Sequence, residues 1–296
     1  MAQANLSGDA VATHLSDQYQ ATIPMRHTVA LVRSTGKALL ERLSSTHGHT
    51  AAPLNVRCKE NNHQNLVTDL DVWVQETLAQ SLAEIEPAAA LFAEEQDNHQ
   101  CHGLTWFVDP IDGTTNFIAT RRDFAICVAL YDGKTPVFGV VYDVTRDLCY
   151  YAQAGGRAYA NDRPLPKRQP VPLEEALFDA SLPTMNALSR RASKPLYPLS
   201  RAVRGHRALG SASLAMCHIA EGSLDAYISN KLYPWDYAAS GVILEACGGV
   251  YGALYDEPLF TTEKAAVLCC GDEGLRAQLA PFLRGEDCPL AAQLEQ

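Results

Sequence analysis

The sequence is organised around residues 106–117, which read Trp106-Phe107-Val108-Asp109-Pro110-Ile111-Asp112-Gly113-Thr114-Thr115-Asn116-Phe117. The apolar residues 106–108 predict a strand that leads into two aspartates, Asp109 and Asp112. Pro110 fixes its own φ and biases Asp109 towards an extended conformation, so the turn can hold both carboxylates in one small volume. Two carboxylates held this close repel each other unless a proton or a cation lies between them. Hard divalent cations such as Mg²⁺ bind such carboxylates, commonly together with a substrate phosphate.

The residues after Asp112 favour an anion at the same place. Gly113, Thr114, Thr115 and Asn116 offer backbone N–H groups and hydroxyls that suit phosphate oxygens, particularly where a helix begins. An Asx-turn with solvated acids would explain a bare Asp-Pro-x-Asp equally well. The whole run is much more specific than its first four residues.

Composition limits the class of protein. The 296 residues are 47% hydrophobic, which is enough for the core of one large domain or two medium domains. A net charge of −10 argues against a nucleic-acid surface, and an acidic protein that acts on an anionic substrate needs a local cationic centre. No apolar run approaches the length of a membrane span, and residues 1–19 lack the pattern of a secretory signal. Nine scattered cysteines without a Cys-x-x-Cys pair indicate a reducing cytoplasm.

The chain divides into three expected parts. Residues 1–24 are polar and aperiodic and are expected to form a loose arm. Residues 25–160 are expected to form an N-terminal α+β lobe, with helices over 25–43 and 69–85 and an antiparallel meander from about residue 124. Residues 161–296 are expected to form an α/β lobe that begins near the proline-rich stretch 163–172.

Four further acidic residues lie where an element begins or ends. Glu94 and Glu95 follow a short apolar strand, Asp71 lies in the first turn of the helix predicted from residue 69, and Asp236 opens an apolar helix after Trp235. Taken singly, each has an ordinary explanation as a solvated strand end or a helix cap.

Together these elements resemble the inositol monophosphatase family, the Mg²⁺-dependent, lithium-sensitive phosphomonoesterases related to fructose-1,6-bisphosphatase. The family pattern D-P-[IL]-D-G-T-x-N-[FY] is matched at every position, and the resemblance extends over about residues 25–283. It implies the layered αβαβα sandwich of that superfamily. It also implies a phosphatase of a small phosphorylated polyol, with inositol phosphate as the expected substrate.

The resemblance also implies a role for each acidic residue. Glu94, Asp109 and the carbonyl of Ile111 would hold a first Mg²⁺, and Asp109, Asp112 and Asp236 a second. Glu94 would share a third ion, which gives two or three ions per site. Thr114 and Glu94 would orient the nucleophilic water, Asp71 would lie near the metals, and the backbone N–H groups of Gly113 and Thr114 would bind phosphate. Lys59 is the candidate for a family lysine on an upstream loop.

The substrate side of the site is less well defined. Residues 207–212 match the family element R-x-x-G-S-A, in which Gly210 permits close backbone approach and Ser211 or Ala212 faces the polyol; Asp236 would also contact it. A simple N-cap for the following helix explains the same residues. Animal inositol monophosphatases have a glutamate seven positions before the aspartate of the Trp-Asp pair, and this chain has Ser229 there.

The substitution at Ser229 leaves other phosphomonoesters open, namely histidinol phosphate, a sugar phosphate or a 3′-phosphoadenosine nucleotide. Thr115-Asn116 in place of the Lys-Glu of the nucleotide-phosphatase branch argues against the last of these. A regulatory binding protein, similar to the bacterial extragenic suppressor proteins, is the alternative of another class. We expect a homodimer, because dimers are common in the family and among oligomers generally, and no direct nucleic-acid or membrane partner.

Overall fold

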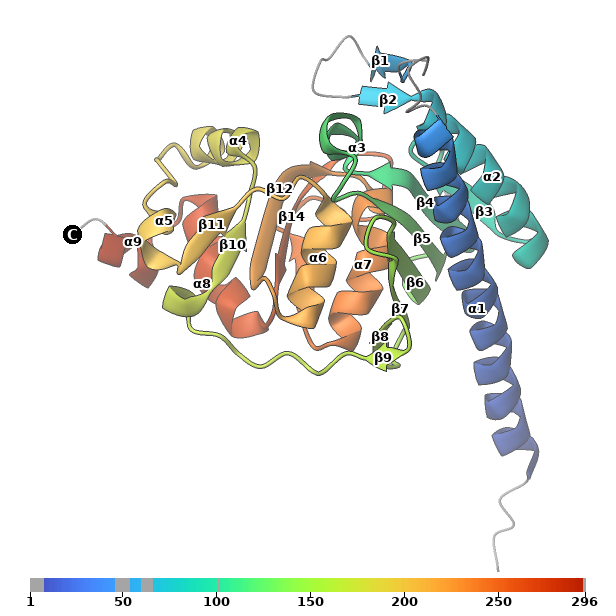
Figure 1. The fold of residues 1–296 in the computed structure, drawn as a ribbon. Coiled ribbons are helices and arrows are strands. Elements are labelled where there is room, and N and C mark those ends of the chain that lie inside the picture. Colours follow the sequence, from blue (N-terminus) through green and yellow to red (C-terminus); the bar gives the residue numbers. More distant parts are fainter. Residues whose placement is uncertain (1–7, 46–53, 60–65, 101, 295–296) are drawn as a thin grey trace, which may run out of the picture.

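The computed structural model describes residues 8–45, 54–59, 66–100 and 102–294, with side chains described from residue 23 onward (Figure 1). The first helix, α1 (Gly8–Ser45), begins earlier than the sequence predicted. Residues 8–24 are therefore helical rather than irregular, residues 1–7 lie outside the described chain, and the assignment of residues 1–24 to a separate arm stays a prediction. Residues 9–23 contain neither glycine nor proline, so they can form a helix without apolar periodicity, and α1 is continuous through Pro24.

A seven-stranded sheet forms the first half of the molecule, and its strands follow one another in chain order. They are β3 (Ala90–Ala93), β4 (Leu104–Asp112), β5 (Ala125–Asp132), β6 (Thr135–Asp143), β7 (Leu148–Gln153), β8 (Ala158–Ala160) and β9 (Arg163–Pro164). Only β3 and β4 pair in parallel within this sheet; the other neighbours are antiparallel. The predicted meander is confirmed, with its tight turn between Asp132 and Thr135.

A second, five-stranded sheet has the order β11-β10-β12-β14-β13. Its strands are β10 (Leu177–Asp179), β11 (Gly205–Arg207), β12 (Ala226–Leu232), β13 (Val250–Ala253) and β14 (Ala265–Cys270). The first three pair in parallel, so their carboxyl ends meet at one edge of the sheet. In open sheets of this kind, ligands bind at the carboxyl ends of parallel strands.

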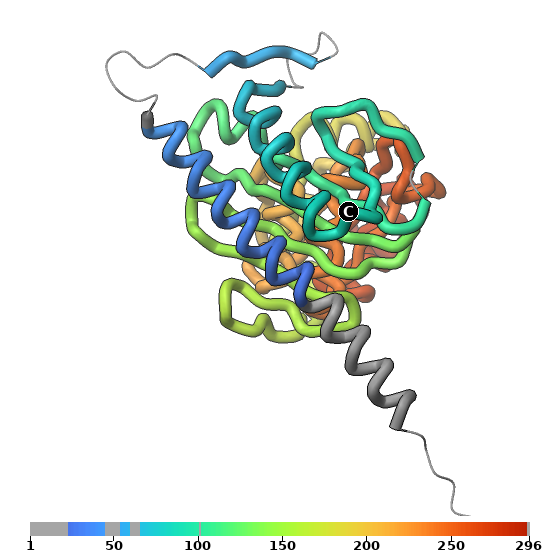
Figure 2. The backbone as a smooth tube through the Cα atoms, turned by 90° about the vertical axis from the view of Figure 1, so that its right-hand side faces the viewer, coloured from blue at the N-terminus to red at the C-terminus, as the bar shows by residue number. Residues whose placement is uncertain are grey.

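Helices fill the layers around and between the sheets. On one face of the seven-stranded sheet lie α1 and α2 (Asp69–Ile85), the latter with the predicted bounds; Figure 2 shows α1 crossing the green strands. Between the sheets lie α6 (Ala212–Glu221) and α7 (Pro234–Ala246). On the outer face of the five-stranded sheet lie α4 (Leu182–Ala192) and α8 (Glu273–Arg284). This is the predicted layered αβαβα sandwich.

Shorter elements complete the fold. They are β1 (Val56–Cys58), β2 (Leu66–Thr68), α3 (Thr114–Thr120), the 3₁₀ turn Leu173–Glu175, α5 (Leu199–Ala202) and α9 (Pro289–Leu294). In the described chain, no helix combines the length and apolar character that crossing a membrane requires. The assignment of the two sheets to separate lobes divided near residues 163–172 stays a prediction.

Helix α7 lies very close to the seven-stranded sheet, and Gly139 makes this close packing possible. A Cβ atom at Gly139 of β6 would lie 2.2 Å from the carbonyl oxygen of Ala239 in α7. Across the same interface the hydroxyl of Tyr131 donates to the carbonyl of Ala238 at 3.0 Å. The start of α7, which carries Asp236, is therefore held in a fixed position relative to the sheet that carries Asp109 and Asp112.

Candidate active site

The signature stretch is built on a strand that runs further than the sequence predicted. We expected the strand to end at Val108, whereas β4 continues to Asp112 with an irregular register between Asp109 and Asp112. Proline has no N–H to donate to a ladder, so Pro110 is compatible with such an irregularity. The backbone N–H of Ile111 instead donates to Oδ1 of Asp109 at 3.0 Å, which fixes that carboxylate.

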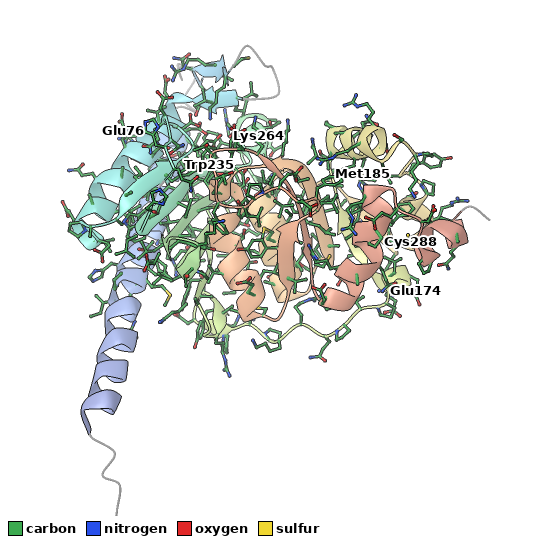
Figure 3. All side chains as sticks on the ribbon, turned by 180° about the vertical axis from the view of Figure 1, so that it is seen from behind. Glu76, Glu174, Met185, Trp235, Lys264 and Cys288 are labelled. Carbon is green, nitrogen blue, oxygen red and sulfur yellow. The ribbon has the colours of Figure 1, made fainter. Side chains whose placement is uncertain are left out.

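Three carboxylates converge at this point from two distant segments. One carboxylate oxygen each from Asp109, Asp112 and Asp236 lies within 4.8 Å of the others. Asp236 lies in the first turn of α7, where its Oδ2 accepts a hydrogen bond from the backbone N–H of Tyr233 at 2.7 Å. Trp235, labelled in Figure 3, precedes it and stacks on Tyr233 with ring centroids 4.4 Å apart. The structure thus brings together the three acids predicted for the second metal.

Burial and mutual repulsion disfavour the ionised forms of these acids. Burial raises the pKa of Asp109 well above its usual range, and the charges of Glu94, Asp112 and Asp236 add to this effect. The pKa of Asp236 is raised well above its usual range for the same reasons, burial first and then Asp112 and Glu94. A cluster of this kind needs protons or a cation. Its donor atoms are all carboxylate oxygens, which is the chemistry that Mg²⁺ prefers.

Asp112 is held by the N-terminus of α6. Its Oδ2 accepts hydrogen bonds from the backbone N–H of Ser213 at 2.7 Å and from the hydroxyls of Ser211 and Ser213, each at 2.5 Å. Its Oδ1 accepts from the backbone N–H of Ala212 at 3.2 Å. Burial raises the pKa of Asp112, and these hydrogen bonds oppose the rise. Residues 211–213 therefore support a metal-site carboxylate.

The sequence allowed two roles for Ser211, contact with the polyol or an N-cap for α6. Its hydroxyl accepts from the backbone N–H of Leu214 at 3.3 Å, which is the helix cap, while it donates to Asp112. Neither interpretation anticipated the bond to Asp112. Ser213 was not predicted as a site residue at all, and only its place directly after the Gly-Ser-Ala element indicates such a contact.

The turn after Asp112 has the geometry of an anion site. Gly113 adopts φ of 91° and is the N-cap of α3, and its Cβ would lie 3.1 Å from the carbonyl oxygen of Asp123. The Thr114 hydroxyl donates to the carbonyl of Ile111 at 3.1 Å, so the carbonyl predicted to be a metal ligand lies beside the predicted water-orienting residue. Exposed N–H groups at such a turn attract phosphate oxygens.

Asn116 joins this turn to the second sheet. Its side-chain amide donates to the carbonyls of Asp123, at 2.9 Å, and Leu209, at 2.7 Å. The backbone N–H of Leu209 donates to Asp179 at 2.8 Å, so Leu209 is held through both its N–H and its carbonyl. Gly210 follows with φ of 82°, and a Cβ there would lie 3.0 Å from the Asn116 side chain. The predicted close approach at Gly210 is therefore an approach to Asn116.

Lys59 lies between the two glutamates at the end of β3. Its Nζ lies 2.8 Å from Oε1 of Glu94, and it also forms an ion pair with Glu95. The backbone N–H of Glu95 donates to the side chain of Gln75 in α2 at 2.8 Å. Gln75 was not predicted, although it lies four positions after Asp71 and hence on the same face of that helix.

Asp71 is buried next to this group. Its Oδ2 accepts from the backbone N–H of Thr68 at 2.8 Å, in a capping box, while its Oδ1 is buried without a hydrogen-bond partner. Burial raises the pKa of Asp71 to about 6; Thr68 opposes the rise, whereas the charge of Glu94 adds to it. An unpaired buried carboxylate oxygen is costly, so this atom is suited to a water or a cation.

Ser229 lies on β12, on the strand face that carries Tyr227. It is buried, with 8% of its surface exposed. Side chains two apart on a strand point to the same face. Tyr227 belongs to the core that also contains Leu214 of α6 and Tyr237 of α7, so this face is directed to the layer between the two sheets. The position that differs from the family glutamate is thus on the site side of the sheet.

Known proteins are similar to this chain in sequence. The sequence pattern of the inositol monophosphatase family matches residues 24–285. An inositol-1-monophosphatase of Bacillus subtilis is 35% identical over 212 residues, 71% of this chain and 80% of that protein. Human inositol monophosphatase 1 is 30% identical, over 76% of this chain and 82% of its own.

Solved structures agree. The inositol monophosphatase-II of Staphylococcus aureus has a TM-score of 0.72 at 26% identity, covering 90% of this chain and 95% of its own. An extragenic suppressor protein of Bartonella henselae has the same fold, with a TM-score of 0.75 at 24% identity, covering 88% of this chain and 98% of its own. The chain belongs to the inositol monophosphatase family.

Proposed function

We propose that this protein is a Mg²⁺-dependent phosphomonoester hydrolase that converts the phosphate of a small polyol, with inositol monophosphate as the first candidate, to free polyol and phosphate. The observation that carries the proposal is the convergence of Asp109, Asp112 and Asp236, with carboxylate oxygens within 4.8 Å, beside the turn at Gly113. A structure of a Staphylococcus aureus relative is a complex with inositol monophosphate. A regulatory role without catalysis is not favoured, because it gives no reason to collect these buried acids.

The residues present fit a hard divalent cation. Asp109, Asp112 and Asp236 would hold one ion, and Glu94, Asp109 and the Ile111 carbonyl would hold another, with Glu94 shared by a third. When bound, Mg²⁺ neutralises the phosphate charge and lowers the pKa of a coordinated water. We expect two or three ions per site and inhibition by lithium.

The other steps belong to residues of this chain. The Gly113 and Thr114 backbone N–H groups would bind the phosphate oxygens at the start of α3. The Thr114 hydroxyl, held 3.1 Å from the Ile111 carbonyl, would orient the attacking water together with Glu94. Asp71 would accept a hydrogen bond from that water network through its unpartnered Oδ1. Ala212 and Ser229 would contact the polyol, together with Asp236.

When the attacking water is held in line with the ester bond, its attack on phosphorus becomes effectively unimolecular. We expect this positioning to supply a large part of the rate enhancement. We propose that the enzyme acts as a cytoplasmic homodimer. The described cysteines are free, most of them buried, as suits a reducing compartment.

The test is the substitution Asp109→Asn. Release of inorganic phosphate from inositol monophosphate in the presence of Mg²⁺ is expected to fall by at least about a thousandfold, because the shared metal ligand loses its charge. Asp132→Asn, at an exposed hairpin position, is the matched control and is expected to keep full activity. Near wild-type turnover by Asp109→Asn would refute the proposal. A panel of histidinol phosphate, sugar phosphates and 3′-phosphoadenosine nucleotides then ranks the substrates.

A further inference from the structure

Two turns from different sheets meet beside the acidic cluster. The phosphate-binding turn, residues 113–116, follows β4 of the seven-stranded sheet, and the turn at Gly210 follows β11 of the five-stranded sheet. A Cβ atom at Gly113 would lie 3.3 Å from the Cβ of Ser211 and 3.4 Å from the carbonyl oxygen of Gly210. The segment proposed to bind phosphate therefore lies directly against the segment that leads into α6.

The position of Leu209 matters to both of these turns. Its carbonyl accepts the hydrogen bond from the Asn116 side chain at 2.7 Å, and Asn116 lies in the first turn of α3. Two residues after Leu209, the hydroxyl of Ser211 donates to Oδ2 of Asp112 at 2.5 Å. A shift of Leu209 would thus disturb both the phosphate-binding turn and a carboxylate of the metal site.

Leu209 lies beyond the end of its strand. The pairing of β10 with β11 ends at Asp179 and Arg207, where the backbone N–H of Ala180 donates to the carbonyl of Arg207 at 3.1 Å. Leu209 is the second residue after β11, and its backbone N–H donates to Oδ2 of Asp179 at 2.8 Å. The side chain of Asp179 thus extends the contact between the two strands by one further hydrogen bond.

Asp179 makes this contact as a buried carboxylate. Its exposed fraction is 2%, and burial raises the pKa of its carboxyl group, whereas the hydrogen bond from Leu209 and the charges of His206 and His218 oppose the rise. A buried carboxylate is destabilising unless it is hydrogen-bonded, and a charged acceptor binds an N–H group more strongly than a neutral one does. Leu209 is therefore held firmly at the end of β10.

We propose that Asp179 is a positioning residue of the active site. It holds Leu209 at the end of β10. From there Asn116 sets the phosphate-binding turn, and Ser211 orients Asp112. The inference rests on the proposed phosphatase function and adds a residue to it. A small displacement of the groups that bind and orient a substrate lowers the rate by a large factor, so loss of this hydrogen bond is expected to reduce activity.

The variants Asp179→Leu and Asp179→Asn separate the acceptor from the shape of the side chain. Leucine has a similar branched shape without an acceptor, whereas asparagine keeps one acceptor oxygen. In the full-length protein with Mg²⁺, we expect kcat/KM for inositol monophosphate to fall at least about tenfold in Asp179→Leu and by less than about threefold in Asp179→Asn. The dissociation constant of inorganic phosphate, measured by calorimetry with Mg²⁺ present, is expected to rise several-fold in Asp179→Leu and to change little in Asp179→Asn.

Asp225 provides a matched control at the other end of β10. It is also buried, and its Oδ2 accepts from the backbone N–H of Leu177 at 2.8 Å, while its Oδ1 pairs with Arg168. Asp225→Leu is expected to lower the melting temperature at least as much as Asp179→Leu does. At a temperature below both transitions, it is expected to keep the kcat/KM and the phosphate affinity of the wild type. If a leucine variant does not fold, Asp179→Ala and Asp225→Ala make the same comparison.

Three results would overturn the positioning role. The first is wild-type kcat/KM and phosphate affinity in Asp179→Leu. The second is an equal loss in Asp179→Leu and Asp225→Leu, which would show that activity follows stability alone. The third is an equal loss in Asp179→Asn and Asp179→Leu, because an acceptor oxygen would then not be what matters. The proposed function fails separately, if the wild type releases no phosphate from any ester of the panel; the calorimetric phosphate affinity then still decides the role of Asp179.

Discussion

Asp112 accepts a hydrogen bond from the backbone N–H of Ser213 at 2.7 Å, although the two residues lie 101 positions apart in the chain. This contact joins the end of β4 in one sheet to the start of α6, which packs against both sheets. A carboxylate needed by a metal is therefore oriented by the layer between the sheets. Any movement of α6 relative to β4 would move Asp112.

The substitution Ser213→Ala tests this support. It removes the hydroxyl that donates to Oδ2 of Asp112 but leaves the backbone donor in place. We expect the free energy of unfolding to fall by about 1–2 kcal/mol, and the apparent Mg²⁺ affinity in phosphatase assays to fall several-fold. Ser223→Ala, at an exposed position just beyond α6, is the control. An unchanged Mg²⁺ dependence would show that the hydroxyl does not orient Asp112.

A second prediction concerns Lys59, whose ammonium lies 2.8 Å from Oε1 of Glu94. A cation bound at Glu94 would be repelled by this neighbouring positive charge. We therefore expect Lys59→Gln to bind Mg²⁺ several-fold more tightly, measured by the thermal shift that Mg²⁺ produces. Lys59→Arg keeps the charge and is expected to behave as the wild type does. Weaker Mg²⁺ binding by Lys59→Gln would show that the lysine helps to assemble the site.

Local patterns in the sequence predicted local structure well. The helix from Asp69 to Ile85 has the predicted bounds, because Thr68 and Asp71 form a capping box and Pro87 lies just beyond it. The fold and the convergence of Asp109, Asp112 and Asp236 also followed from the sequence, but through the family resemblance rather than through spacing.

Contacts between distant segments were not predictable in the same way. Asn116 reaches Leu209, 93 positions away, and Gln75 of α2 reaches Glu95 in the turn after β3, 20 positions away. The residues around Asn116 and Gln75 do not indicate these contacts, because a side-chain amide can form hydrogen bonds with many different groups in the chain. The early start of α1 was missed for another reason. Apolar periodicity reports where a helix packs, whereas the helix itself can extend beyond the packed segment, as α1 does on the N-terminal side of Pro24.

The pH dependence of stability provides a third prediction, through Asp71. Burial raises its pKa from 3.8 to about 6, so between these values the folded state binds more protons than the unfolded state. The contribution of Asp71 to stability is then fully present below pH 4 and is lost as pH rises to about 6. In metal-free protein, we expect the free energy of unfolding of the wild type to fall by on the order of 2 kcal/mol relative to that of Asp71→Asn as the pH rises through this range.

Urea unfolding in EDTA at a series of pH values measures this difference. Asp69→Asn, which changes an exposed neighbour in the same helical turn, serves as the control and is expected to follow the wild type. If the curves of wild type and Asp71→Asn stay parallel from pH 4 to pH 6, the buried acid does not titrate in this range.

The last prediction addresses substrate preference through Ser229, the position at which this chain departs from the family glutamate. Ser229 lies on the face of β12 directed to the layer between the two sheets, and a serine hydroxyl forms only a neutral hydrogen bond to a polyol. A glutamate there would form a charge-assisted bond, which is worth about 1.5–3 kcal/mol. We therefore expect Ser229→Glu to raise kcat/KM for inositol monophosphate by about tenfold or more, with little change for a phosphate ester that lacks further hydroxyls.

Ser229→Gln provides the matched comparison, because the glutamine side chain has the same length as that of glutamate but carries no charge. It is expected to give only a small part of the gain, since the bond to the polyol would again be neutral. Equal effects of the two substitutions would attribute the gain to side-chain size. A fall in kcat/KM for inositol monophosphate with Ser229→Glu, together with a gain for another ester in the panel, would show that this site selects a substrate other than inositol phosphate.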